Sequence, residues 1–393
     1  MRSKILRKRR AANGRPFDLM SFTSLSELTS CRRLVVKIGS ALLIDGGEPR
    51  EAWLGKLVQD LVNLRAQGIE IVVVSSGAIA LGAAKLKLPG GGRANLADAQ
   101  AAASVGQIAL SGLWAEKFNQ FGLTAAQMLL SLSDLEDRRR YLNASATLAR
   151  LLQTGAVPVI NENDSVATEE IRFGDNDRLA ARVAQAADAD GVLLLSDVDG
   201  LYDRHPKQAG AQFIGRVNGI TPEILAMASG ESSSGMGSGG MVSKLQAAQI
   251  AERAGITLAI IDGTQPAPIA TAVSSDHGTV FIPQRSDTAR KAWLGGRLTS
   301  EGVLTVDAGC AKALLNDGAS VLAVGVTAVD GSFERGSLVE VHDPDGKAIA
   351  KGLVEYDSVV CRRIAGMRED FQAKTLGYAP RAAVVHRDHM VLL

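Results

Sequence analysis

The sequence of 393 residues has few of the residues that several kinds of site require. Aromatic residues make up 4%, too few for a protein that stacks nucleic-acid bases over a broad surface. Cys31, Cys310 and Cys361 lie far apart without a CxxC pair, which excludes a disulfide framework and a zinc knuckle. No apolar run is long enough to cross a membrane. We therefore expect a protein of the reducing cytoplasm with no membrane partner.

The residues that are present indicate a folded protein preceded by a basic segment. Hydrophobic residues make up 46% of the chain and charged residues 22%, and the length favours two domains. Residues 1–16 carry seven Lys or Arg and no acid, which leaves a net charge of about −6 on the rest. We expect residues 1–31 to form a disordered arm, either a leader from an upstream start or a segment that touches nucleic acid or a membrane.

From residue 32 to residue 280, short apolar runs alternate with helical patterns. The runs are rich in Val, Ile and Leu, which predicts strands buried on both faces at Leu34–Ile38, Ile69–Val74, Ala156–Ile160, Gly191–Leu195 and Ile256–Ile261. The helical patterns lie at Glu51–Ala66, Leu96–Phe121, Asp134–Gln153, Asn176–Ala187 and Gly240–Ala254. This alternation predicts an α/β three-layer sandwich with a mostly parallel central sheet, whose ligands bind beyond the carboxyl ends of the strands.

The pattern changes after residue 280. We expect a linker over residues 281–300 and a small β-rich domain over residues 301–393. In this domain the sequence predicts a helix at Cys310–Asn316, strands at Ser320–Val326, Leu338–His342, Ala348–Glu355 and Ala382–Val385, and turns at residues 330–331 and 345–346.

Two of the predicted strands end in residues that suit an anion. Lys37 interrupts the first apolar strand, where its charge needs a partner, and Gly39 and Ser40 follow it. The second strand ends at Ser75 and Ser76, directly before a helical run whose free N–H groups attract a carboxylate or phosphate. The alternatives are a strand-edge lysine that reaches solvent and serines that only cap a helix.

The third strand is followed by two clusters of acidic and amide side chains. Asn161–Asp164 comes directly after the strand, and Gly174–Asp177 begins the next helical pattern. Together they supply carboxylates and amides enough to hold an α-amino group, a magnesium ion or both. A solvated acidic loop is the alternative.

The fourth strand and a later glycine-rich loop suit a nucleotide. The strand leads into Ser196 and Asp197, which either contact a nucleotide or belong to a plain surface turn. Residues 235–240 match the pattern GxGxxG, but a Ser-rich stretch precedes them instead of a strand, so a dinucleotide fingerprint is excluded. The P-loop pattern is also absent. A glycine loop, a helix N-terminus and Lys244 in its first turn remain, and they suit a phosphate.

Lys37 and Lys244 thus stand at opposite ends of the domain sequence, both beside glycine turns. Phosphoryl transfer needs positive charge on the transferring group and on the leaving phosphate, and each lysine can supply part of it. Their separation in sequence is no obstacle where all strand ends meet along one edge of the sheet.

As a set, these segments resemble the amino acid kinase family, and within it the members that act on glutamate. The resemblance is carried by residues 35–40, 75–80, 161–164, 173–177, 195–202 and 239–244, and it covers about residues 32–393. Its most specific part is the pairing of Asn161–Asp164 with Gly174–Asp177. The C-terminal region resembles a PUA domain, on Arg362–Gly366 and residues 383–390.

The resemblance implies a role for each matching residue. Lys37 and Lys244 would neutralise charge on the phosphoryl group, and Asp177 would orient the lysines or a metal. Glutamate would be held by Ser76, Asp164 and Asn176. ATP would be bound by Lys37, Ser196, Asp197, Ser238, Gly239, Gly240, Met241, Val242, Ser243 and Lys244.

The activity implied is ATP-dependent phosphorylation of the glutamate γ-carboxylate to γ-glutamyl phosphate, the first step of proline biosynthesis. Mg²⁺ would bridge the phosphates, with its protein ligands left open, and Asp164 would contact the ammonium group. A carboxylate is ionised at neutral pH, so no general base is needed. Because the product is a labile acyl phosphate, the resemblance also implies a glutamyl phosphate reductase as partner. Feedback inhibition by proline and a homo-oligomer are further expectations.

Two other functions stay open at this point. One is RNA binding through the PUA domain, against which residues 305–370 are not strongly basic and contain few aromatics. We therefore expect no nucleic-acid partner. The other is a kinase of the same fold that acts on a different carboxylate or on a nucleotide, because substrate choice depends on a few polar contacts within residues 161–177.

Overall fold

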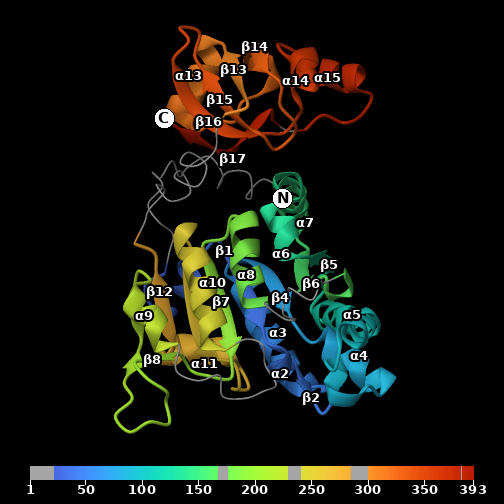
Figure 1. Cartoon of the computed structure of the whole chain (residues 1–393), viewed down its shortest axis with the longest axis vertical. Helices are drawn as coiled ribbons and strands as arrows, with labels where there is room; N and C mark the ends of the chain where they lie inside the picture. The colour runs from blue at the N-terminus through green and yellow to red at the C-terminus, as the bar shows by residue number, and fades with distance from the viewer. Residues whose placement is uncertain (1–21, 167–175, 229–239, 285–299, 382) are drawn as a thin grey trace, which may run out of the picture.

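The chain forms two domains stacked along its long axis (Figure 1). The computed structural model describes residues 22–166, 176–228, 240–284, 300–381 and 383–393. The N-terminal domain holds a large sheet between helices, and the C-terminal domain begins with strand β13 at Gly302. Most of the linker expected over residues 281–300 lies outside the described residues.

An eight-stranded sheet forms the centre of the N-terminal domain, in the order β10-β12-β11-β7-β1-β4-β6-β5. Six neighbouring strands, from β11 to β5, are parallel, while β12 runs antiparallel to β11. The strands are β1 (Arg33–Ile38), β4 (Glu70–Ser75), β5 (Ala125–Leu130), β6 (Val157–Glu162), β7 (Gly191–Ser196), β10 (Arg216–Asn218), β11 (Thr257–Asp262) and β12 (Thr279–Ile282). Two short hairpins, β2 (Ile44–Asp45) with β3 (Glu48–Pro49) and β8 (Leu201–Tyr202) with β9 (Phe213–Ile214), complete the domain.

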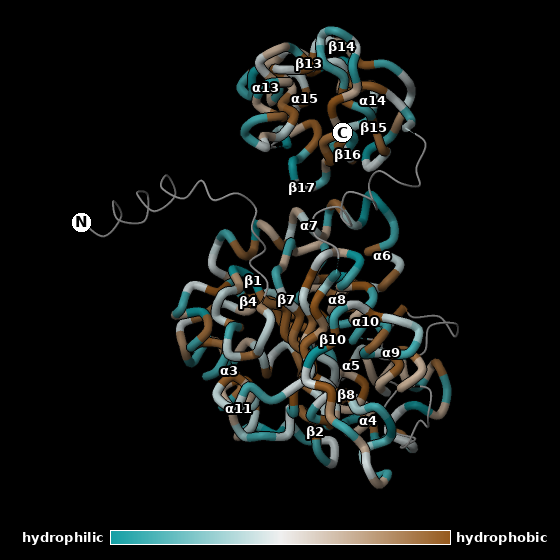
Figure 2. Tube along the Cα trace, turned by 90° about the vertical axis from the view of Figure 1, so that its left-hand side faces the viewer, coloured by the Kyte–Doolittle hydropathy of each residue, from teal (hydrophilic) through white to brown (hydrophobic). Residues whose placement is uncertain are grey.

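Helices cover both faces of this sheet, so the fold is the predicted three-layer sandwich (Figure 2). Side chains alternate between two cores: Val35 of β1 belongs to the core under α7, α8 and α10, whereas Leu34 and Val36 belong to the core under α3, α5 and α11. The helices are α2 (Ser40–Leu43), α3 (Glu51–Ala66), α4 (Ala78–Leu86), α5 (Leu96–Asn119), α6 (Leu132–Glu136), α7 (Arg138–Gln153), α8 (Asn176–Ala186), α9 (Pro222–Met227), α10 (Met241–Arg253) and α11 (Pro268–Ser275).

The structure differs from the expected elements at particular places. The single helix expected over Asp134–Gln153 is two helices, because Asp137 leaves helical geometry and its side chain caps α7 by accepting from the Arg140 N–H at 2.9 Å. Strands β5, β10 and β12 were not expected. β5 is mostly half-buried and contains Gln127, and β10 and β12 have three and four residues, so neither hydrophobicity nor length marks them.

The segment before β1 also differs from the expected arm. Residues 22–31 contain the 3₁₀ helix η1 (Leu25–Ser30), and Phe22, Leu25 and Leu28 are buried in the core shared with β1. Leu25 and Leu28 are one turn apart in a helix of three residues per turn, so both face the core. The last ten residues of the arm expected over 1–31 are therefore folded, and residues 1–21 lie outside the described residues.

The C-terminal domain is a five-stranded sheet in the order β14-β13-β15-β16-β17 with three helices. Its elements are β13 (Gly302–Val306), α13 (Ala308–Asp317), η4 (Ala323–Gly325), β14 (Val326–Gly331), β15 (Leu338–His342), β16 (Ala348–Val354), α14 (Ser358–Ile364), α15 (Glu369–Leu376) and β17 (Val385–Leu392). The strand expected at Ser320–Val326 is a bridge and a 3₁₀ turn instead, and residues 330–331, expected as a turn, end β14. Helices α14 and α15 were not expected.

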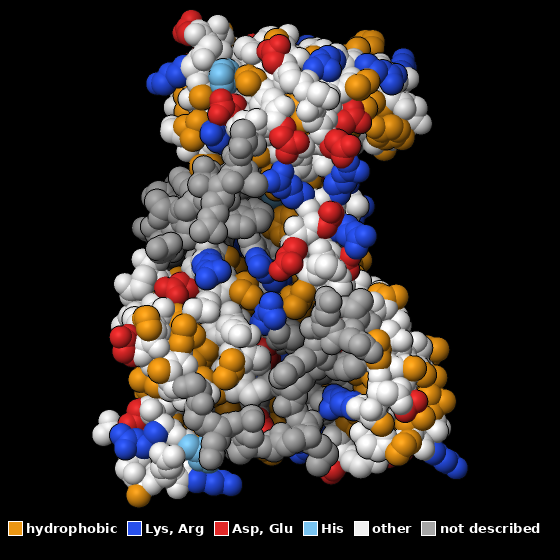
Figure 3. All heavy atoms as spheres, in the orientation of Figure 1, with side chains coloured by type: hydrophobic (Ala, Val, Ile, Leu, Met, Phe, Trp, Pro, Cys, Tyr) orange, Lys and Arg blue, Asp and Glu red, His pale blue; other side chains and the backbone are white. Residues whose placement is uncertain are grey.

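Charged side chains of both signs gather where the two domains meet (Figure 3). Arg138 lies 3.3 Å from Glu301, and Arg139 is paired with Glu334. Under these ion pairs, strands β15, β16 and β17 contribute Leu338, Leu353 and Val391 to the core of the N-terminal domain. Buried apolar side chains therefore join the domains, and the surface ion pairs add little to the free energy of association.

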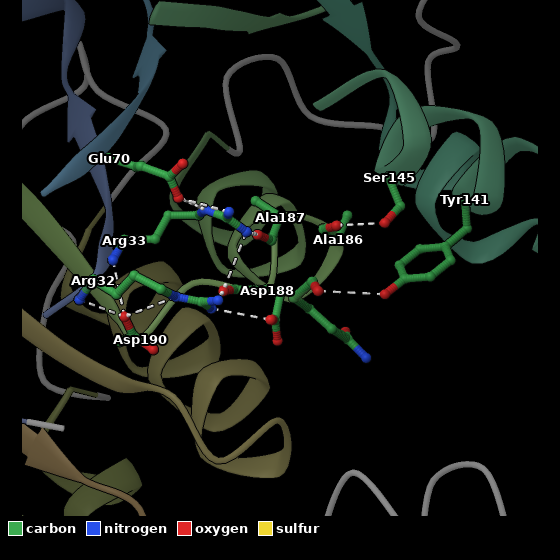
Figure 4. Close-up of polar contacts among 10 residues, drawn as sticks. Arg32, Arg33, Glu70, Tyr141, Ser145, Ala186, Ala187, Asp188 and Asp190 are labelled. Atoms are coloured by element: carbon green, nitrogen blue, oxygen red, sulfur yellow. Dashed lines mark hydrogen bonds and ion pairs between the residues drawn. The ribbon is translucent and has the colours of Figure 1, made fainter. Parts of the chain in front are cut away.

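Side chains from other elements hold the C-terminal end of α8 (Figure 4). Four consecutive carbonyl groups there each accept a hydrogen bond: Gln185 from Tyr141, Ala186 from Ser145, Ala187 from Arg33 and Asp188 from Arg32. The last carbonyls of a helix have no partner within it, so these donors replace water. Tyr141 also packs edge-on against His389 of the C-terminal domain, with ring centroids 6.0 Å apart. Helix α8 is therefore fixed at the end nearer to that domain.

Helices α4 and α5 cross with their backbones in contact. A Cβ atom on Gly106 of α5 would lie 1.8 Å from the carbonyl oxygen of Ala78 in α4, and one on Gly82 would lie 1.8 Å from that of Ala102. Only glycine permits this approach. The crossing also fixes the start of α4, which follows Ser75 and Ser76 at the end of β4.

Replacement of Gly106 by alanine should destabilise the protein by more than about 3 kcal/mol, because the backbones of α4 and α5 must separate. Gly112→Ala is the matched control: it lies in the same helix with nothing within 4 Å of an added Cβ, and it should stabilise by about 0.5 to 1 kcal/mol. Urea unfolding of both variants measures the difference. Equal free energies of unfolding would contradict the crossing.

Candidate active site

The polar segments predicted from the sequence meet at one edge of the large sheet. Strands β7, β1, β4 and β6 are neighbours and parallel, so the residues at their carboxyl ends lie side by side. In register, Ile38 is opposite Ser75 on one side and Leu195 on the other. This edge carries α2 and the β2 hairpin and faces away from the C-terminal domain (Figure 1).

Asp177 joins the two predicted lysines. One carboxylate oxygen lies 2.6 Å from Lys37 Nζ and the other lies 3.2 Å from Lys244 Nζ, while the Ser243 hydroxyl donates to the latter oxygen at 2.9 Å. Lys37 reaches this place because it shares a face of β1 with Val35, under α8 and α10. Strand β1 and the first turns of α8 and α10 thus converge on one carboxylate.

The charges at this point are almost fully buried: Asp177 is 1% exposed, Lys244 5% and Lys37 7%. Burial by itself would raise the pKa of Asp177, but the charges of Lys37 and Lys244 lower that pKa to about 2. Two lysines with one carboxylate leave one net positive charge in a place of low dielectric constant. The cluster therefore attracts an anion that can approach from the sheet edge.

A chain of amide hydrogen bonds lies on the other side of β1. The Asn176 Nδ2 group donates to the Ser76 hydroxyl oxygen at 2.7 Å and to Asn161 Oδ1 at 3.1 Å. Asn161 Nδ2 in turn donates to Gln107 Oε1 at 2.9 Å. Ser75, beside Ser76, accepts from the Trp114 indole N–H at 2.9 Å. Two positions on α5 therefore support the residues at the ends of β4 and β6.

Asn176 Oδ1 and Asp164 Oδ1 are buried and have no hydrogen-bond partner among the described residues. Asp164 is 6% exposed. Burial raises the pKa of Asp164 to about 6, against the opposite effect of Arg93. Buried acceptors without partners are costly, and each of these oxygens can accept a hydrogen bond from a donor such as an ammonium group.

The other flank of the lysine cluster has the features of a nucleotide site. Ser196 ends β7, its hydroxyl donates to Asp197 at 3.1 Å, and its carbonyl accepts from the Gly263 N–H at 2.7 Å. Helix α10 begins after Gly240 without a side-chain cap, so its first N–H groups are open to a ligand. Val242, in the first turn, is 50% exposed. Ser238 and Gly239 lie outside the described residues.

The structure brings together most of the predicted site residues. Lys37, Lys244 and Asp177 form one ion-paired cluster, and Ser76 and Asn176 share a hydrogen bond. Two further residues were not chosen from the sequence. Asn161 belongs to a motif that was noticed, but only the fold shows that it links two other amides. Gln107 lies on α5, far from the motifs, and its only signal in the sequence is a polar residue beside Gly106.

The described residues do not build a metal site by themselves. Within the described ranges, no three His, Cys, Asp or Glu side chains lie close enough to hold a metal ion. Both carboxylate oxygens of Asp177 are engaged by lysines. In the same part of the chain, no helix has the length and hydrophobicity needed to cross a membrane.

Comparison with known proteins agrees with this geometry. Residues 32–262 match the amino acid kinase family and residues 302–370 match the PUA domain. The chain is similar to the glutamate 5-kinase of Novosphingobium aromaticivorans, with 63% identity over 95% of this chain and 100% of that one. It is also similar to the glutamate 5-kinase of Sphingopyxis alaskensis, with 60% identity over 94% of this chain and 100% of that one. Its identity to the glutamate 5-kinase of Zymomonas mobilis is 54%, over 93% of this chain and 92% of that one. The family resemblance and the fold class inferred from the sequence are both confirmed.

Asp164→Asn should make the protein more stable at pH 8, by about 1 to 3 kcal/mol. The pKa of Asp164 in the folded chain, about 6, exceeds the ordinary value of 3.8, so the unfolded chain releases this proton first as the pH rises. The stability of the natural protein therefore falls between about pH 4 and pH 6, and the advantage of the variant should vanish near pH 4. Urea unfolding at several pH values measures this.

Asp203→Asn is the control with the opposite sign, because a hydrogen bond from Arg204 lowers the pKa of Asp203. It should give no gain in stability at pH 8. If the Asp164→Asn protein is less stable than the natural one at pH 8, burial of the charged Asp164 carboxylate does not destabilise the folded chain.

Proposed function

This chain belongs to the amino acid kinase family, and from that premise we propose that it transfers the γ-phosphoryl group of ATP to the γ-carboxylate of glutamate. Its curated relatives with 54 to 63% identity are glutamate 5-kinases over nearly their whole length. The observation that carries the proposal is the cluster of Lys37, Asp177 and Lys244 at the same sheet edge as Asn176 Oδ1 and Asp164 Oδ1, two buried acceptors without a partner in the described part of the chain.

Glutamate binds on the side of β4 and β6. Its ammonium group donates to Asp164 and to Asn176 Oδ1, which removes the cost of burying two acceptors without partners. The Ser76 hydroxyl accepts from Asn176, so its own hydrogen can be donated to a carboxylate of the substrate. These three residues suit an amino acid better than a plain dicarboxylate, because two of them require a donor.

ATP binds on the side of β7 and α10. Ser196 and Asp197 follow β7, and the first turn of α10, from Gly240 through Lys244, offers N–H groups and an ammonium to the phosphates. Ser238 and Gly239 belong to the same proposed loop. Lys37 stands between the two substrates, since β1 lies between β7 and β4.

Transfer needs alignment and positive charge rather than a base. The γ-carboxylate is ionised at neutral pH and attacks the γ-phosphorus of ATP directly. Negative charge builds on the transferring group and on the leaving phosphate, where Lys37 and Lys244 neutralise it. Asp177 keeps both ammonium groups in place before the reaction, so little reorganisation is needed during it.

We propose that Mg²⁺ enters with ATP as part of the co-substrate. Mg²⁺ commonly keeps most of its contacts with phosphates and water.

The fate of the product follows from its chemistry. γ-Glutamyl phosphate is an acyl phosphate and hydrolyses in water, so a glutamyl phosphate reductase that consumes it promptly, on the route to proline, is the proposed partner. Feedback inhibition by proline, a homo-oligomeric state and a cytoplasmic location stay predictions from the family resemblance.

The activity can be tested by trapping the product. Incubation with ATP, Mg²⁺, glutamate and hydroxylamine should yield the γ-glutamyl hydroxamate, because hydroxylamine attacks the acyl phosphate. Colorimetric detection with ferric ion measures it. Hydroxamate formed from aspartate or acetylglutamate but not from glutamate would replace the proposed substrate with another carboxylate.

Lys244→Ala should lower turnover by about 100- to 1,000-fold and change the KM for glutamate by less than about threefold, because the lysine acts on the transferring group. Lys56→Ala, which removes an exposed lysine from α3, is the matched control and should leave both constants unchanged. Unchanged turnover in Lys244→Ala would show that the start of α10 is only structural.

A further inference from the structure

Helix α5 presents three polar or aromatic side chains toward the substrate side of the sheet. Gln107, Ser111 and Trp114 are spaced by four and three residues, so they share one face of the helix. Gln107 contacts Asn161, and Trp114 contacts Ser75. None of the three lies in a motif that marks phosphoryl transfer, yet the face meets the ends of both β4 and β6.

The direction of the hydrogen bonds along this face is set by Ser111. Gln107 Nε2 donates to the Ser111 hydroxyl oxygen at 3.2 Å, while that hydroxyl is within 2.8 Å of the Gln107 carbonyl and 2.5 Å of Gln127 Oε1, both acceptors. The Ser111 hydrogen is therefore committed to an acceptor, and the hydroxyl oxygen can only accept from Gln107. This leaves Gln107 Oε1 facing Asn161 as an acceptor.

The donor and acceptor roles of the next two amides, Asn161 and Asn176, follow from that of Gln107. Asn161 Nδ2 donates to Gln107 Oε1, so Asn161 Oδ1 faces Asn176 as an acceptor. Asn176 Nδ2 donates one hydrogen to Asn161 Oδ1 and the other to the Ser76 hydroxyl oxygen. Its Oδ1 has no hydrogen-bond partner among the described residues and, as an oxygen, can only accept a hydrogen bond. Asn176 is 2% exposed.

Reversal of one amide would reverse the next. If Asn161 rotated by half a turn, its Nδ2 would face the Nδ2 group of Asn176, and two donors would meet without an acceptor. Asn176 would have to rotate as well and would present its Nδ2 group to the substrate in place of Oδ1. The site would then repel an ammonium group that it is built to bind.

We propose that Gln107 is a positioning residue that fixes the orientation of the Asn161 and Asn176 amides and thereby selects substrates with an ammonium group. The proposal rests on the proposed function, because the ammonium in question is that of glutamate. Gln107 does not touch the substrate; it acts through Asn161. The close crossing of α4 and α5 at Gly106 and Gly82 holds the backbone next to Gln107 against α4, the helix that follows Ser76.

The test compares glutamate with glutarate, the same dicarboxylate without the amino group, in the hydroxamate assay. Gln107→Leu removes the acceptor and should raise the KM for glutamate by about 10- to 100-fold, the loss expected for a hydrogen bond to a charged group. The KM for ATP should stay within about twofold, and the preference for glutamate over glutarate in kcat/KM should fall by the same factor as glutamate affinity.

Gln107→Glu is the conservative variant, because its carboxylate still accepts from Asn161. It should keep the KM for glutamate within about threefold and restore the preference. Gln120→Leu, the same change in the exposed residue that follows α5, is the matched control. Ser111→Ala gives a second reading if Gln107→Leu folds poorly in a thermal melt: it frees the Gln107 amide to rotate and should lower the same preference.

The results distinguish a positioning role of Gln107 from a packing role. A glutamate preference unchanged in Gln107→Leu and Ser111→Ala would overturn the positioning role. Equal losses in Gln107→Leu and Gln107→Glu, or parallel losses for glutamate and glutarate, would show that Gln107 only packs. Natural protein that gives hydroxamate from neither acid would overturn the proposed function itself, which is a distinct result.

Discussion

The pairing of Asp177 with Lys37 and Lys244 is the constraint on which the rest of the N-terminal domain depends. Each of these charges would be costly to bury alone. Removal of one partner from a buried pair destabilises a protein more than replacement of the whole pair by apolar residues. Strand β1 and helices α8 and α10 must therefore converge within hydrogen-bonding distance of one carboxylate. The two lysines leave an excess of positive charge at the sheet edge, and that excess is what a transferring phosphoryl group requires.

Helix α8 connects this constraint to the rest of the molecule. Its first turn carries Asn176 and Asp177, and its last carbonyls are held by side chains from α7 and from the start of β1. Eleven residues of helix span about 16 Å, so α8 reaches from the site to the level of the C-terminal domain. That domain lies beyond the opposite edge of the sheet, and its His389 contacts Tyr141 of α7, which also bonds to the end of α8.

Much of the architecture could be predicted because the parallel strands are buried on both faces and are bounded by turns. The five strands expected in the N-terminal domain all exist, with ends within two residues of those expected. Strand β5 was missed because it is a half-buried edge strand without a hydrophobic pattern. The helix expected over Asp134–Gln153 was wrong because Asp137 caps α7 and divides a continuous helical pattern. The prediction was also wrong at Ser320–Val326, where an apolar run turns instead of extending. Hydrophobic side chains specify that a segment is buried, but they do not specify its backbone geometry.

The sequence by itself determined which chemical groups gather at the carboxyl ends of the strands, because in a parallel sheet those ends must share one edge. Lys37, Ser76, Asp164 and Ser196 could be named on that ground, whereas Asn176 and Asp177 could be named as the polar start of a helical pattern. Only the tertiary structure decided how they are joined: Asp177 bridges two lysines 207 positions apart in the chain, and Asn161 donates to Gln107 and accepts from Asn176. The reason is physical. Hydrogen-bond direction depends on the partner of each amide, and those partners lie on elements that come together only when the sheet and helix α5 are packed.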